Sequence, residues 1–450
     1  MAARSASRAS AKLAFAARFV NVGGVMTDRT YDVAIVGASI AGSAAATLFA
    51  RRGLRVALIE RAPDVAAYKT ACTHYIQPSA TAAIERLGLA ERLDQRGAVR
   101  NSIDLWTRYG WARHPDDLPH GYSMRRQTLD PIVRQLAAHT PGVDLMLGHR
   151  VTELLEDDGR VAGVRATTPD GRELSVRPRF VVAADGRSSH LAKEARVPTR
   201  TWPNRRFAYW AYFGHLPLRT GSTAQLWFLD PRVAYAFPNE DDVTLVVFWG
   251  HKRELGDFKG DIDGAVRSRW AEIPDAPRLE DGEQLTSWLG QRDVPNVRRP
   301  AAHRGMALIG DAAQASDPVW GVGCGWAFQS AEWLVESTAD ALLGEHGLEP
   351  ALAAYRRRHR RELMLHHLVI SEYSRGRRFM IPEKLTFAAA ARDPAVARHI
   401  HSYAARLIPV SKFLSPVAGA RTLRALMRRR PDGQPAPRAA APQREHSSIS

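Results

Sequence analysis

A run of small residues near the start of the chain has the spacing of a site for a phosphorylated ligand. Gly37 and Gly42 bracket the sequence Gly-Ala-Ser-Ile-Ala-Gly. The first glycine permits a tight turn, and the last permits close packing of a helix on a strand. The free N–H groups and the dipole of that helix favour a pyrophosphate. Ser39 replaces the middle glycine of a dinucleotide-binding fingerprint, and the cluster also contains Ile40 and Ala41.

An acidic residue stands where the ribose of a dinucleotide would need one. Glu60 follows Gly37 by 23 residues, close to the offset of about 20 residues at which such an acid is expected. Arg61 comes next. A glycine-rich turn in an unrelated α/β fold is the alternative reading. The combination of strand, helix, strand and terminal acid favours the dinucleotide site.

Two further motifs, each a glycine next to an aspartate, come directly after apolar runs. Asp185-Gly186 follows residues 180–184, and Gly310-Asp311 follows residues 306–309. A carboxylate at the end of a strand is a suitable acceptor for ligand hydroxyl groups, although Asp311 alone would also suit the N-cap of a helix. A glycine-rich stretch follows the second pair, and its residues of interest are Pro318, Gly321, Gly323, Cys324 and Gly325.

The elements that position these clusters follow from hydrophobic periodicity. Strands at 31–36 and 55–60, with a helix at 43–52 between them, predict a βαβ unit. Further along the chain we expect helices at 79–96, at 128–139 and from Trp326 onward. We also expect a meander of strands at 143–147, 159–167 and 172–176, and buried strands at 180–184 and 306–309.

The composition of the chain changes between residues 201 and 300, which hold 15 of the 36 aromatic residues. Apolar runs at 233–237 and 243–249 flank a polar turn and predict a hairpin. We expect an antiparallel sheet here that forms a second domain. Its aromatic side chains are candidate walls of a substrate pocket, or equally plain sheet core: Trp210, Trp227, Tyr235 and Phe237.

Taken in this order, the three motifs resemble those of the single-component FAD-dependent monooxygenases with the p-hydroxybenzoate hydroxylase fold, and the resemblance covers roughly residues 28–345. It implies an α/β fold: a Rossmann-like FAD-binding domain with an inserted mixed or antiparallel β-sheet substrate domain and a C-terminal helical extension. The expected domains are the two parts of the FAD-binding domain at 28–200 and 301–345, the sheet domain at 201–300, C-terminal helices at 346–430, and tails at 1–25 and 431–450.

The resemblance also implies roles for the motif residues. The first motif would hold the ADP half of FAD, Asp185-Gly186 would contact the pyrophosphate indirectly and help with NAD(P)H, and Asp311 would bind the flavin ribose. The stretch 321–325 would form a loop against the isoalloxazine ring. Arg126 stands where the family commonly has an arginine that reaches toward FAD. For Cys324, a packing role, a redox role and a covalent flavin link remain open.

In such enzymes NADPH or NADH reduces FAD, O2 adds at flavin C4a, and the hydroperoxide hydroxylates or epoxidises an aromatic or apolar small molecule. The flavin carries the chemistry, so we expect no catalytic side chain. A reductase of isoprenoid C=C bonds is the main alternative. A flavin halogenase is disfavoured because the chain has no Trp-x-Trp. A non-catalytic flavoprotein that docks on membranes through the basic segment 355–361 and the C-terminal arginine cluster is a further alternative.

Composition narrows the possibilities further. Of the formal net charge of +16, four basic residues and no acid lie in residues 1–25, and seven arginines against two acids lie in residues 421–450. This distribution disfavours nucleic-acid binding. Two cysteines, Cys72 and Cys324, imply neither a metal site nor a disulfide framework, which suits a reducing cytoplasm. The segment before Met26 is read as a transit peptide or as a mis-assigned start.

Overall fold

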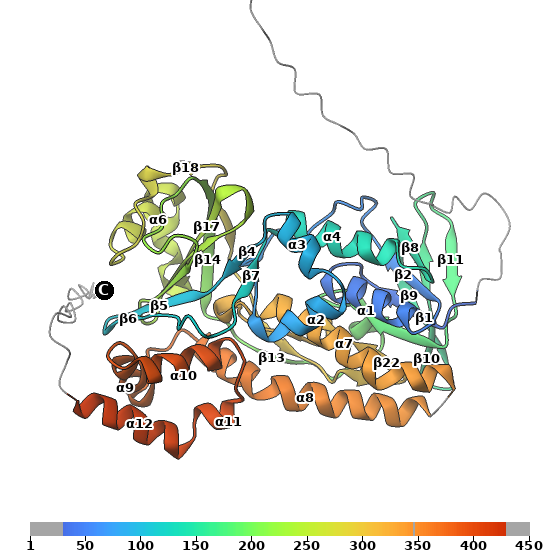
Figure 1. Ribbon diagram of the computed structural model, residues 1–450. Coiled ribbons are helices and arrows are strands. Elements are labelled where there is room, and N and C mark those ends of the chain that lie inside the picture. Colours follow the sequence, from blue (N-terminus) through green and yellow to red (C-terminus); the bar gives the residue numbers. More distant parts are fainter. Residues whose placement is uncertain (1–29, 345–346, 429–450) are drawn as a thin grey trace, which may run out of the picture. The chain divides into compact units, whose positions relative to one another are not determined.

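The computed structural model describes residues 30–344 and 347–428, so both expected tails, 1–25 and 431–450, lie outside the described residues. Figure 1 shows the arrangement of the helices and strands. The expected fold class is confirmed: parallel strands with flanking helices, a second, mixed sheet and a C-terminal helical region. The expected domain boundaries remain a prediction.

The first sheet has six strands in the order β21-β22-β12-β1-β2-β8, parallel apart from the β21–β22 pair. Its central strand β1 has the sequence Val-Ala-Ile-Val and is buried throughout, as expected for a parallel strand that is covered on both faces. The strands are β1 (Val33–Val36), β2 (Val56–Glu60), β8 (Val143–Leu147), β12 (Phe180–Ala183), β21 (Ala302–His303) and β22 (Met306–Leu308).

One predicted strand belongs to a different sheet from the one expected. Residues 143–147 form β8 beside β2 in the parallel sheet, not the first strand of the meander. The meander is built from β9 (Arg150–Asp157), β10 (Arg160–Thr167) and β11 (Glu173–Val176). Most residues of β9 are exposed or half-buried, so the apolar alternation that would reveal a strand is weak there.

Helices pack against the parallel sheet and against one another. α1 (Ile40–Arg51) contacts both α4 (Arg126–Ala138) and α7 (Val322–Leu343), and α7 contacts α8 (Leu348–Tyr373). The helix expected at 79–96 is broken into α2 (Thr81–Arg86) and α3 (Ala90–Gln95), because Gly88 adopts a positive φ of 69° between them. The remaining short helix of this region is α5 (His190–Glu194).

The second sheet has eight strands, in the order β18-β14-β17-β16-β15-β5-β6 with β19 paired to β14. The expected hairpin is confirmed, with Phe237 opposite Leu245. Two strands come from outside 201–300, because β5 pairs in parallel with β15 and carries β6 with it. The strands are β5 (Ile103–Thr107), β6 (Gly110–Ala112), β14 (Arg206–Gly214), β15 (Ala224–Phe228), β16 (Val233–Pro238), β17 (Val243–His251), β18 (Glu283–Gln284) and β19 (Leu289–Gln291).

Two three-stranded sheets join these parts: β3 (Tyr75–Ile76), β7 (Gly121–Ser123) and β4 (Val99–Asn101) form one, and β13 (Arg200–Trp202), β20 (Asn296–Arg298) and β23 (Gln314–Ala315) form the other. Helix α6 (Ile262–Ala271) lies beside the large sheet, and helices α9 (Ile381–Ala390), α10 (Pro394–Ala404), α11 (Val410–Phe413) and α12 (Pro416–Met427) follow α8.

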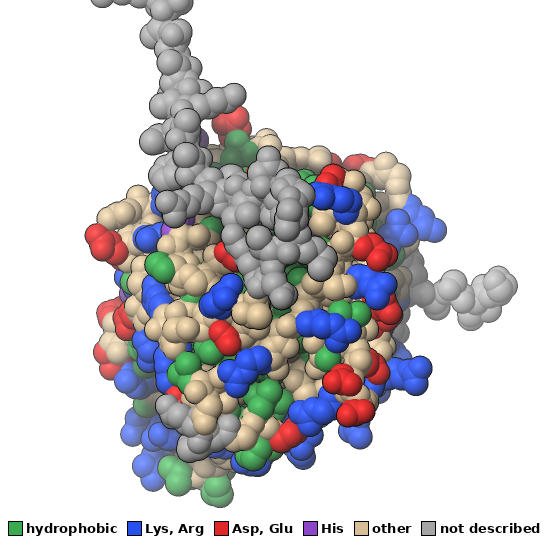
Figure 2. Space-filling view, turned by 90° about the vertical axis from the view of Figure 1, so that its right-hand side faces the viewer, with side chains coloured by type: hydrophobic (Ala, Val, Ile, Leu, Met, Phe, Trp, Pro, Cys, Tyr) green, Lys and Arg blue, Asp and Glu red, His purple; other side chains and the backbone are tan. Residues whose placement is uncertain are grey.

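Figure 2 shows basic and acidic side chains interspersed on one face of the molecule. Among the helices of the described part, none combines the length and apolar character that crossing a bilayer requires.

Candidate functional site

The turn between β1 and α1 requires glycine at both ends. Gly37 has a φ of 103°, and a Cβ there would lie 2.4 Å from the carbonyl oxygen of Ala184. A Cβ on Gly42 would lie 1.8 Å from the carbonyl oxygen of Gly37. The two glycines therefore let β1, α1 and the start of the Asp185-Gly186 motif meet at backbone distance, as the fingerprint predicts.

The first turn of α1 is left open to an anion. Ser39 is the N-cap residue, but its side chain makes no capping hydrogen bond. Instead Arg126 Nη2 donates to Ser39 Oγ at 2.7 Å. The N–H groups that begin a helix lack intrahelical partners, so this terminus combines an uncapped helix end with a guanidinium group. Both favour the pyrophosphate of a dinucleotide.

Arg126 is held in place by an acid on its own helix. Its Nε and Nη2 donate to the two carboxylate oxygens of Asp130 at 2.6 and 2.9 Å, and both side chains are buried. Burial opposes the charge of Arg126, but Asp130 raises the arginine's pKa well above its ordinary value. The guanidinium group is therefore a fixed positive charge beside Ser39.

A second arginine of α4, Arg134, supports the turn between β1 and α1. Arg134 Nε donates to the carbonyl oxygen of Ala38 at 2.9 Å, and Nη1 donates to that of Ala67 at 2.7 Å. Sequence reasoning missed this residue. Its i+8 spacing from Arg126, with Asp130 between them, is the signal that would have placed all three side chains on one face of α4.

Glu60 lies beside the turn, as its position at the end of β2 predicts. Its carboxylate accepts hydrogen bonds from the backbone N–H groups of Ala38 at 2.7 Å and Ala62 at 2.9 Å. The side chain is half-buried, whereas that of Arg61 is exposed. Glu60 thus brings a carboxylate to the rim of the first motif.

The backbone of the Asp185-Gly186 motif lies beside the turn at Gly37. The carboxylate of Asp185 is engaged locally, because it accepts from Ser189 Oγ at 2.6 Å and from the N–H of Leu191 at 3.0 Å. These bonds hold the start of α5. Gly186 has a φ of 84°, and no atom lies within 4 Å of the position where its Cβ would stand.

The Gly310-Asp311 motif packs directly on α1. Gly310 has a φ of 55°, and a Cβ there would lie 2.9 Å from Cβ of Ala41. Lys69 Nζ donates to Asp311 Oδ2 at 2.8 Å. Burial disfavours ionisation of Asp311, but Lys69 and then Arg187 bring its pKa below the ordinary value. Asp311 is therefore an ionised acceptor in this site.

A buried arginine that the sequence reading missed ties the second and third motifs together. Arg299 Nη1 donates to the carbonyl oxygen of Ala312 at 2.9 Å, and Nη2 donates to that of Arg187 at 3.0 Å. No local pattern distinguishes this residue from its neighbour Arg298 in the sequence. The link becomes visible only once the strands are assembled.

The glycine-rich stretch after Pro318 is mainly helix, which corrects the expected loop at 321–325. Gly321, with a φ of 62°, is the N-cap of α7, so Gly323, Cys324 and Gly325 lie in the first turns of that helix. The helix begins four residues before Trp326 because Gly321 supplies the left-handed turn. No atom lies within 4 Å of a Cβ placed on Gly323.

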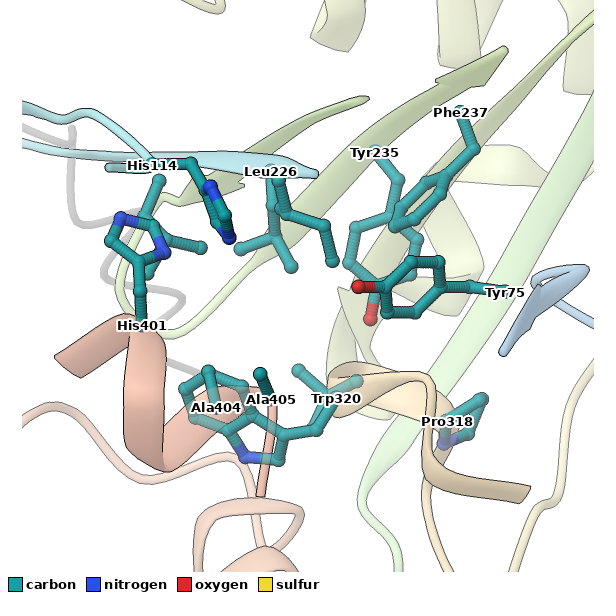
Figure 3. Close-up of a pocket in the computed structure, with 13 residues that line it drawn as sticks. Tyr75, His114, Leu226, Tyr235, Phe237, Pro318, Trp320, His401, Ala404 and Ala405 are labelled. Atoms are coloured by element: carbon teal, nitrogen blue, oxygen red, sulfur yellow. The ribbon is translucent and has the colours of Figure 1, made fainter. Parts of the chain in front are cut away.

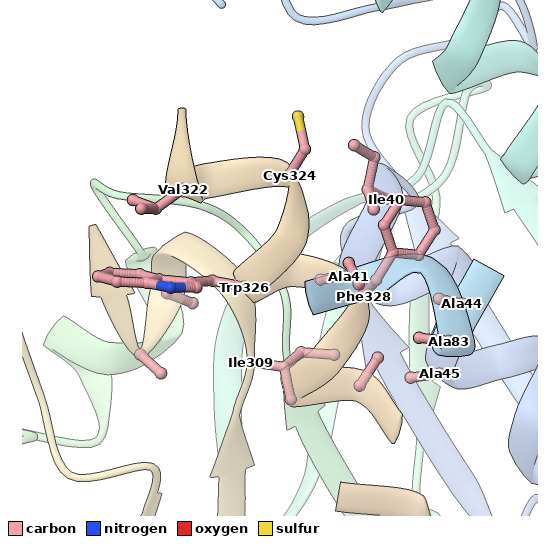
Figure 4. Close-up of a cluster of buried hydrophobic side chains, with 14 of the residues drawn as sticks. Ile40, Ala41, Ala44, Ala45, Ala83, Ile309, Val322, Cys324, Trp326 and Phe328 are labelled. Atoms are coloured by element: carbon pink, nitrogen blue, oxygen red, sulfur yellow. The ribbon is translucent and has the colours of Figure 1, made fainter. Parts of the chain in front are cut away.

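Figure 4 shows this end of α7 next to α1. Cys324 is buried, and its sulfur lies 3.7 Å from that of Cys72. Trp326 and Phe328 belong to the large apolar core with Ile40 and Ala41. The starts of α1 and α7 are therefore neighbours, and neither has a side-chain cap.

A narrow apolar cavity lies between the large sheet, the segment before α7, and helix α10. About 30 Å³ is free in it, which is room for a water molecule or two. Figure 3 shows the hydroxyl groups of Tyr75 and Tyr235 pointing toward the same space. The lining residues are Tyr75, Ile103, Leu105, His114, Leu226, Tyr235, Phe237, Pro318, Val319, Trp320, His401, Ala404 and Ala405.

Two of the four aromatic wall candidates line this cavity, namely Tyr235 and Phe237. Trp227 belongs to a separate apolar cluster with Trp270, so it lies away from the cavity. Trp210 is buried in the main core without lining the cavity. The alternation of side chains between the two faces of a strand accounts for the position of Trp227, since it is one residue away from the cavity-lining Leu226.

The polar groups of the cavity are mostly uncharged. Burial raises the pKa of both Tyr75 and Tyr235, so their hydroxyl groups stay protonated. The Tyr235 hydroxyl has no hydrogen-bond partner among the described residues. At the other end, burial lowers the pKa of His401 to about 4, and its Nε2 lies 3.0 Å from the carbonyl oxygen of Ala112. The His114 ring packs against that of His401.

Comparison with known proteins identifies the family. The family described as FAD binding domain matches residues 30–365, more than half of the chain. The chain belongs to the FAD binding domain family.

Relatives in this family have different activities. A digeranylgeranylglycerophospholipid reductase 1 of Methanococcoides burtonii is 26% identical over 343 residues, which cover 73% of this chain and 79% of the relative. A kynurenine 3-monooxygenase of Salinispora arenicola is 29% identical over 369 residues, covering 73% and 76%. The solved structure of the flavin-dependent brominase Bmp2 shares the fold, with a TM-score of 0.73 at 18% identity over 88% of this chain and 98% of that one.

The residues fit the cofactor of the FAD binding domain family. Two neighbouring uncapped helix ends and the buried Arg126 suit a pyrophosphate. Open space borders Gly186 and Gly323, where a Cβ would meet no other atom. The chain is an FAD-dependent oxidoreductase of this family. Among the described residues no group of three or more His, Cys, Asp or Glu side chains has the arrangement of a metal site.

Proposed function

We propose that the protein is an NAD(P)H-dependent monooxygenase that hydroxylates or epoxidises an aromatic or apolar small molecule with O2. The observation that carries this proposal is the apolar cavity bounded by Pro318 and Trp320, directly before the start of α7. A substrate there would lie beside the helix end that we assign to the flavin. Bound FAD supplies the electron transfer and the oxygen activation.

The cavity has the character of a water-excluding site. Its walls are aliphatic and aromatic side chains from the large sheet and from helix α10, and most of them are buried. A dry site protects reactive species from hydrolysis. Because the free space is small, a substrate has to displace side chains. Trp320, Ala404 at the end of α10 and the C-cap residue Ala405 form the wall opposite the sheet (Figure 3).

Two tyrosines would orient the substrate within this cavity. Tyr235 is almost completely buried, and within the part of the chain that the structure describes its hydroxyl has no hydrogen-bond partner, which costs free energy unless a ligand accepts its hydrogen bond. Tyr75 points its hydroxyl to the same space from β3 (Figure 3). Both hydroxyls are donors at neutral pH. We therefore propose that the substrate has an oxygen acceptor, such as a carbonyl or hydroxyl oxygen, facing this pair.

The experiment that tests this function is turnover with isotopically labelled O2 and mass analysis of the product. A monooxygenase puts one labelled oxygen atom into the product and the other into water. Product without label, formed while O2 is present, contradicts the proposal. The variant Tyr235→Phe serves as a matched comparison, because it keeps the apolar wall while removing the proposed donor.

The second candidate is reduction of an isoprenoid-type C=C bond. The similarity to the Methanococcoides burtonii reductase favours it, and so does the apolar lining of the cavity. The two candidates separate without oxygen. Product that gains two hydrogens under strictly anaerobic conditions, with a reductant present, supports the reductase, whereas a monooxygenase forms no product there.

A further inference from the structure

The two cysteines of the chain meet although 252 positions separate them in the sequence. Cys72 precedes β3, Cys324 lies in the first turn of α7, and their sulfur atoms are 3.7 Å apart. Both are free thiols. In Figure 4 the Cys324 side chain points away from the apolar side chains of Trp326 and Phe328. This contact is the only one that two cysteines in this chain can make.

The surroundings of Cys72 favour its thiolate. The backbone N–H of His74 donates to its sulfur at 3.3 Å, and Arg126 Nη1 donates to it at 3.8 Å. The hydrogen bond from the Cys324 thiol lowers the pKa of Cys72 well below the ordinary value, and His74 and Arg126 act in the same direction. Cys324 is correspondingly held as the neutral thiol, and its pKa is raised.

Access differs between the two thiols in a way that suits two successive roles. Cys72 is half-buried, whereas Cys324 is fully buried. A small oxidant therefore reaches Cys72 first. The neighbouring Cys324 then has to approach by less than about 2 Å to reach the S–S bond length of about 2.05 Å.

We propose that Cys72 and Cys324 form a redox-active thiol pair for hydrogen peroxide, with Cys72 as the attacking residue and Cys324 as the resolving one. The Cys72 thiolate attacks one peroxide oxygen, the O–O bond breaks, and the other oxygen leaves as water after taking a proton. The Cys324 sulfur then attacks the Cys72 sulfenic acid, the S–O bond breaks, and a second water leaves. Two thiols and one H2O2 give one disulfide and two waters.

This pair is independent of the reaction proposed for the flavin, since it needs only peroxide. The disulfide would tie the segment before β3 to the start of α7. That segment also carries Lys69, the partner of Asp311. Oxidation of the pair would therefore fix two of the walls that we assign to the cofactor site.

The test uses the FAD-loaded full chain treated with hydrogen peroxide at stoichiometric amounts, followed by denaturing alkylation and mass spectrometry. We expect both thiols of the wild type to become protected together, with a mass loss of two hydrogens, and a reductant to restore them. Cys72 should react roughly tenfold faster than the same residue in the unfolded chain. Two thiols that remain alkylatable in the wild type would overturn the proposal.

Two variants separate the roles. In Cys324→Ser the sulfenic acid of Cys72 cannot be resolved within the chain, so dimedone should trap it. In Cys72→Ser the Cys324 thiol should stay alkylatable at the same peroxide dose. FAD content of each variant confirms that it is folded. Trapping on Cys324 in the Cys72→Ser variant, at the wild-type rate, would show that the roles are wrong.

Discussion

Lys69 and Asp311 are joined by an ion pair of 2.8 Å, although 242 positions separate them in the sequence. The lysine comes from the segment before β3, and the aspartate follows the parallel strand β22. Burial by itself would favour a neutral carboxyl group, yet Lys69 lowers the pKa of Asp311. The pair therefore keeps a negative charge at the end of β22, where a ribose hydroxyl can donate to it.

Asp311→Asn should weaken FAD binding roughly ten- to hundredfold, because a hydrogen bond to a charged group contributes about 1.5–3 kcal/mol. Titration of the apoprotein with FAD, followed by flavin fluorescence, measures the change. Asp340→Asn is the matched control, since that carboxylate pairs with Arg52 on the surface, and it should bind FAD like the wild type. Equal affinity of the Asp311 variant and the wild type would argue against the assigned role.

Gly323→Ala should separate stability from cofactor binding. The position is helical and no atom lies within 4 Å of the added Cβ, so the apoprotein should gain a few tenths to about 1 kcal/mol in stability. FAD affinity should fall, because the added methyl group takes up space that we assign to the isoalloxazine ring. Gly419→Ala in α12, which also has open space, should be stabilising with unchanged FAD affinity. Thermal melts and FAD titrations of both variants check this, and unaltered affinity in Gly323→Ala would exclude close approach of the flavin there.

Tyr235→Phe should raise the KM for the substrate without destabilising the protein. The hydroxyl is buried and unpartnered among the described residues, so removing it costs no hydrogen bond and relieves a desolvation penalty of about 1–3 kcal/mol. Tyr355→Phe should leave the KM unchanged and lower the free energy of unfolding by about 1 kcal/mol. Its hydroxyl donates to the carbonyl oxygen of Leu308 at 2.9 Å, so the variant loses a hydrogen bond. Urea unfolding and steady-state kinetics of the two variants give the comparison. A Tyr235 variant with unchanged KM would remove the proposed substrate contact.

His401→Gln should reduce the loss of stability in mild acid. Burial lowers the folded-state pKa of His401 to about 4, whereas the unfolded value is about 6.5. The unfolded chain therefore binds the proton first, and stability falls as pH drops from about 6.5 toward 4. Between pH 7 and pH 5 this histidine accounts for about 2 kcal/mol of the loss.

Unfolding free energies at pH 7 and pH 5 test the histidine prediction. The His401 variant should lose less stability than the wild type over this interval. His215→Gln is the control, because that side chain is exposed and pairs with Asp242 at the surface. A pH dependence of His401→Gln identical to the wild type would show that folding does not lower the pKa of this histidine.

The parts of the site built from local geometry could be predicted from the sequence. The turn at Gly37 and Gly42 depends on two steric requirements that only glycine meets, and Glu60 follows from the length of one βαβ unit. The hairpin around residues 238–242 likewise depends on neighbouring residues. Such features involve short separations, where the chain has few alternatives.

The parts that depend on distant pairing could not be predicted in this way. The contact of Cys72 with Cys324, the ties made by Arg299, and the pairing of β5 with β15 all join segments that no periodicity relates. Trp227 lies in a separate apolar cluster and Tyr235 lines the cavity, and predicting this difference requires the register of the strands. The early start of α7 depended on the left-handed conformation of Gly321, which composition alone does not reveal.

The parallel pairing of β5 with β15 bears on how the chain is made. During synthesis β5 and β6 leave the ribosome well before β15, so β5 keeps one edge unpaired while the intervening residues are translated. An unpaired strand edge is a template for aggregation. The nascent chain therefore carries an unpaired strand edge over this interval, and we expect a gene truncated between β6 and β15 to yield aggregated protein instead of a smaller folded domain.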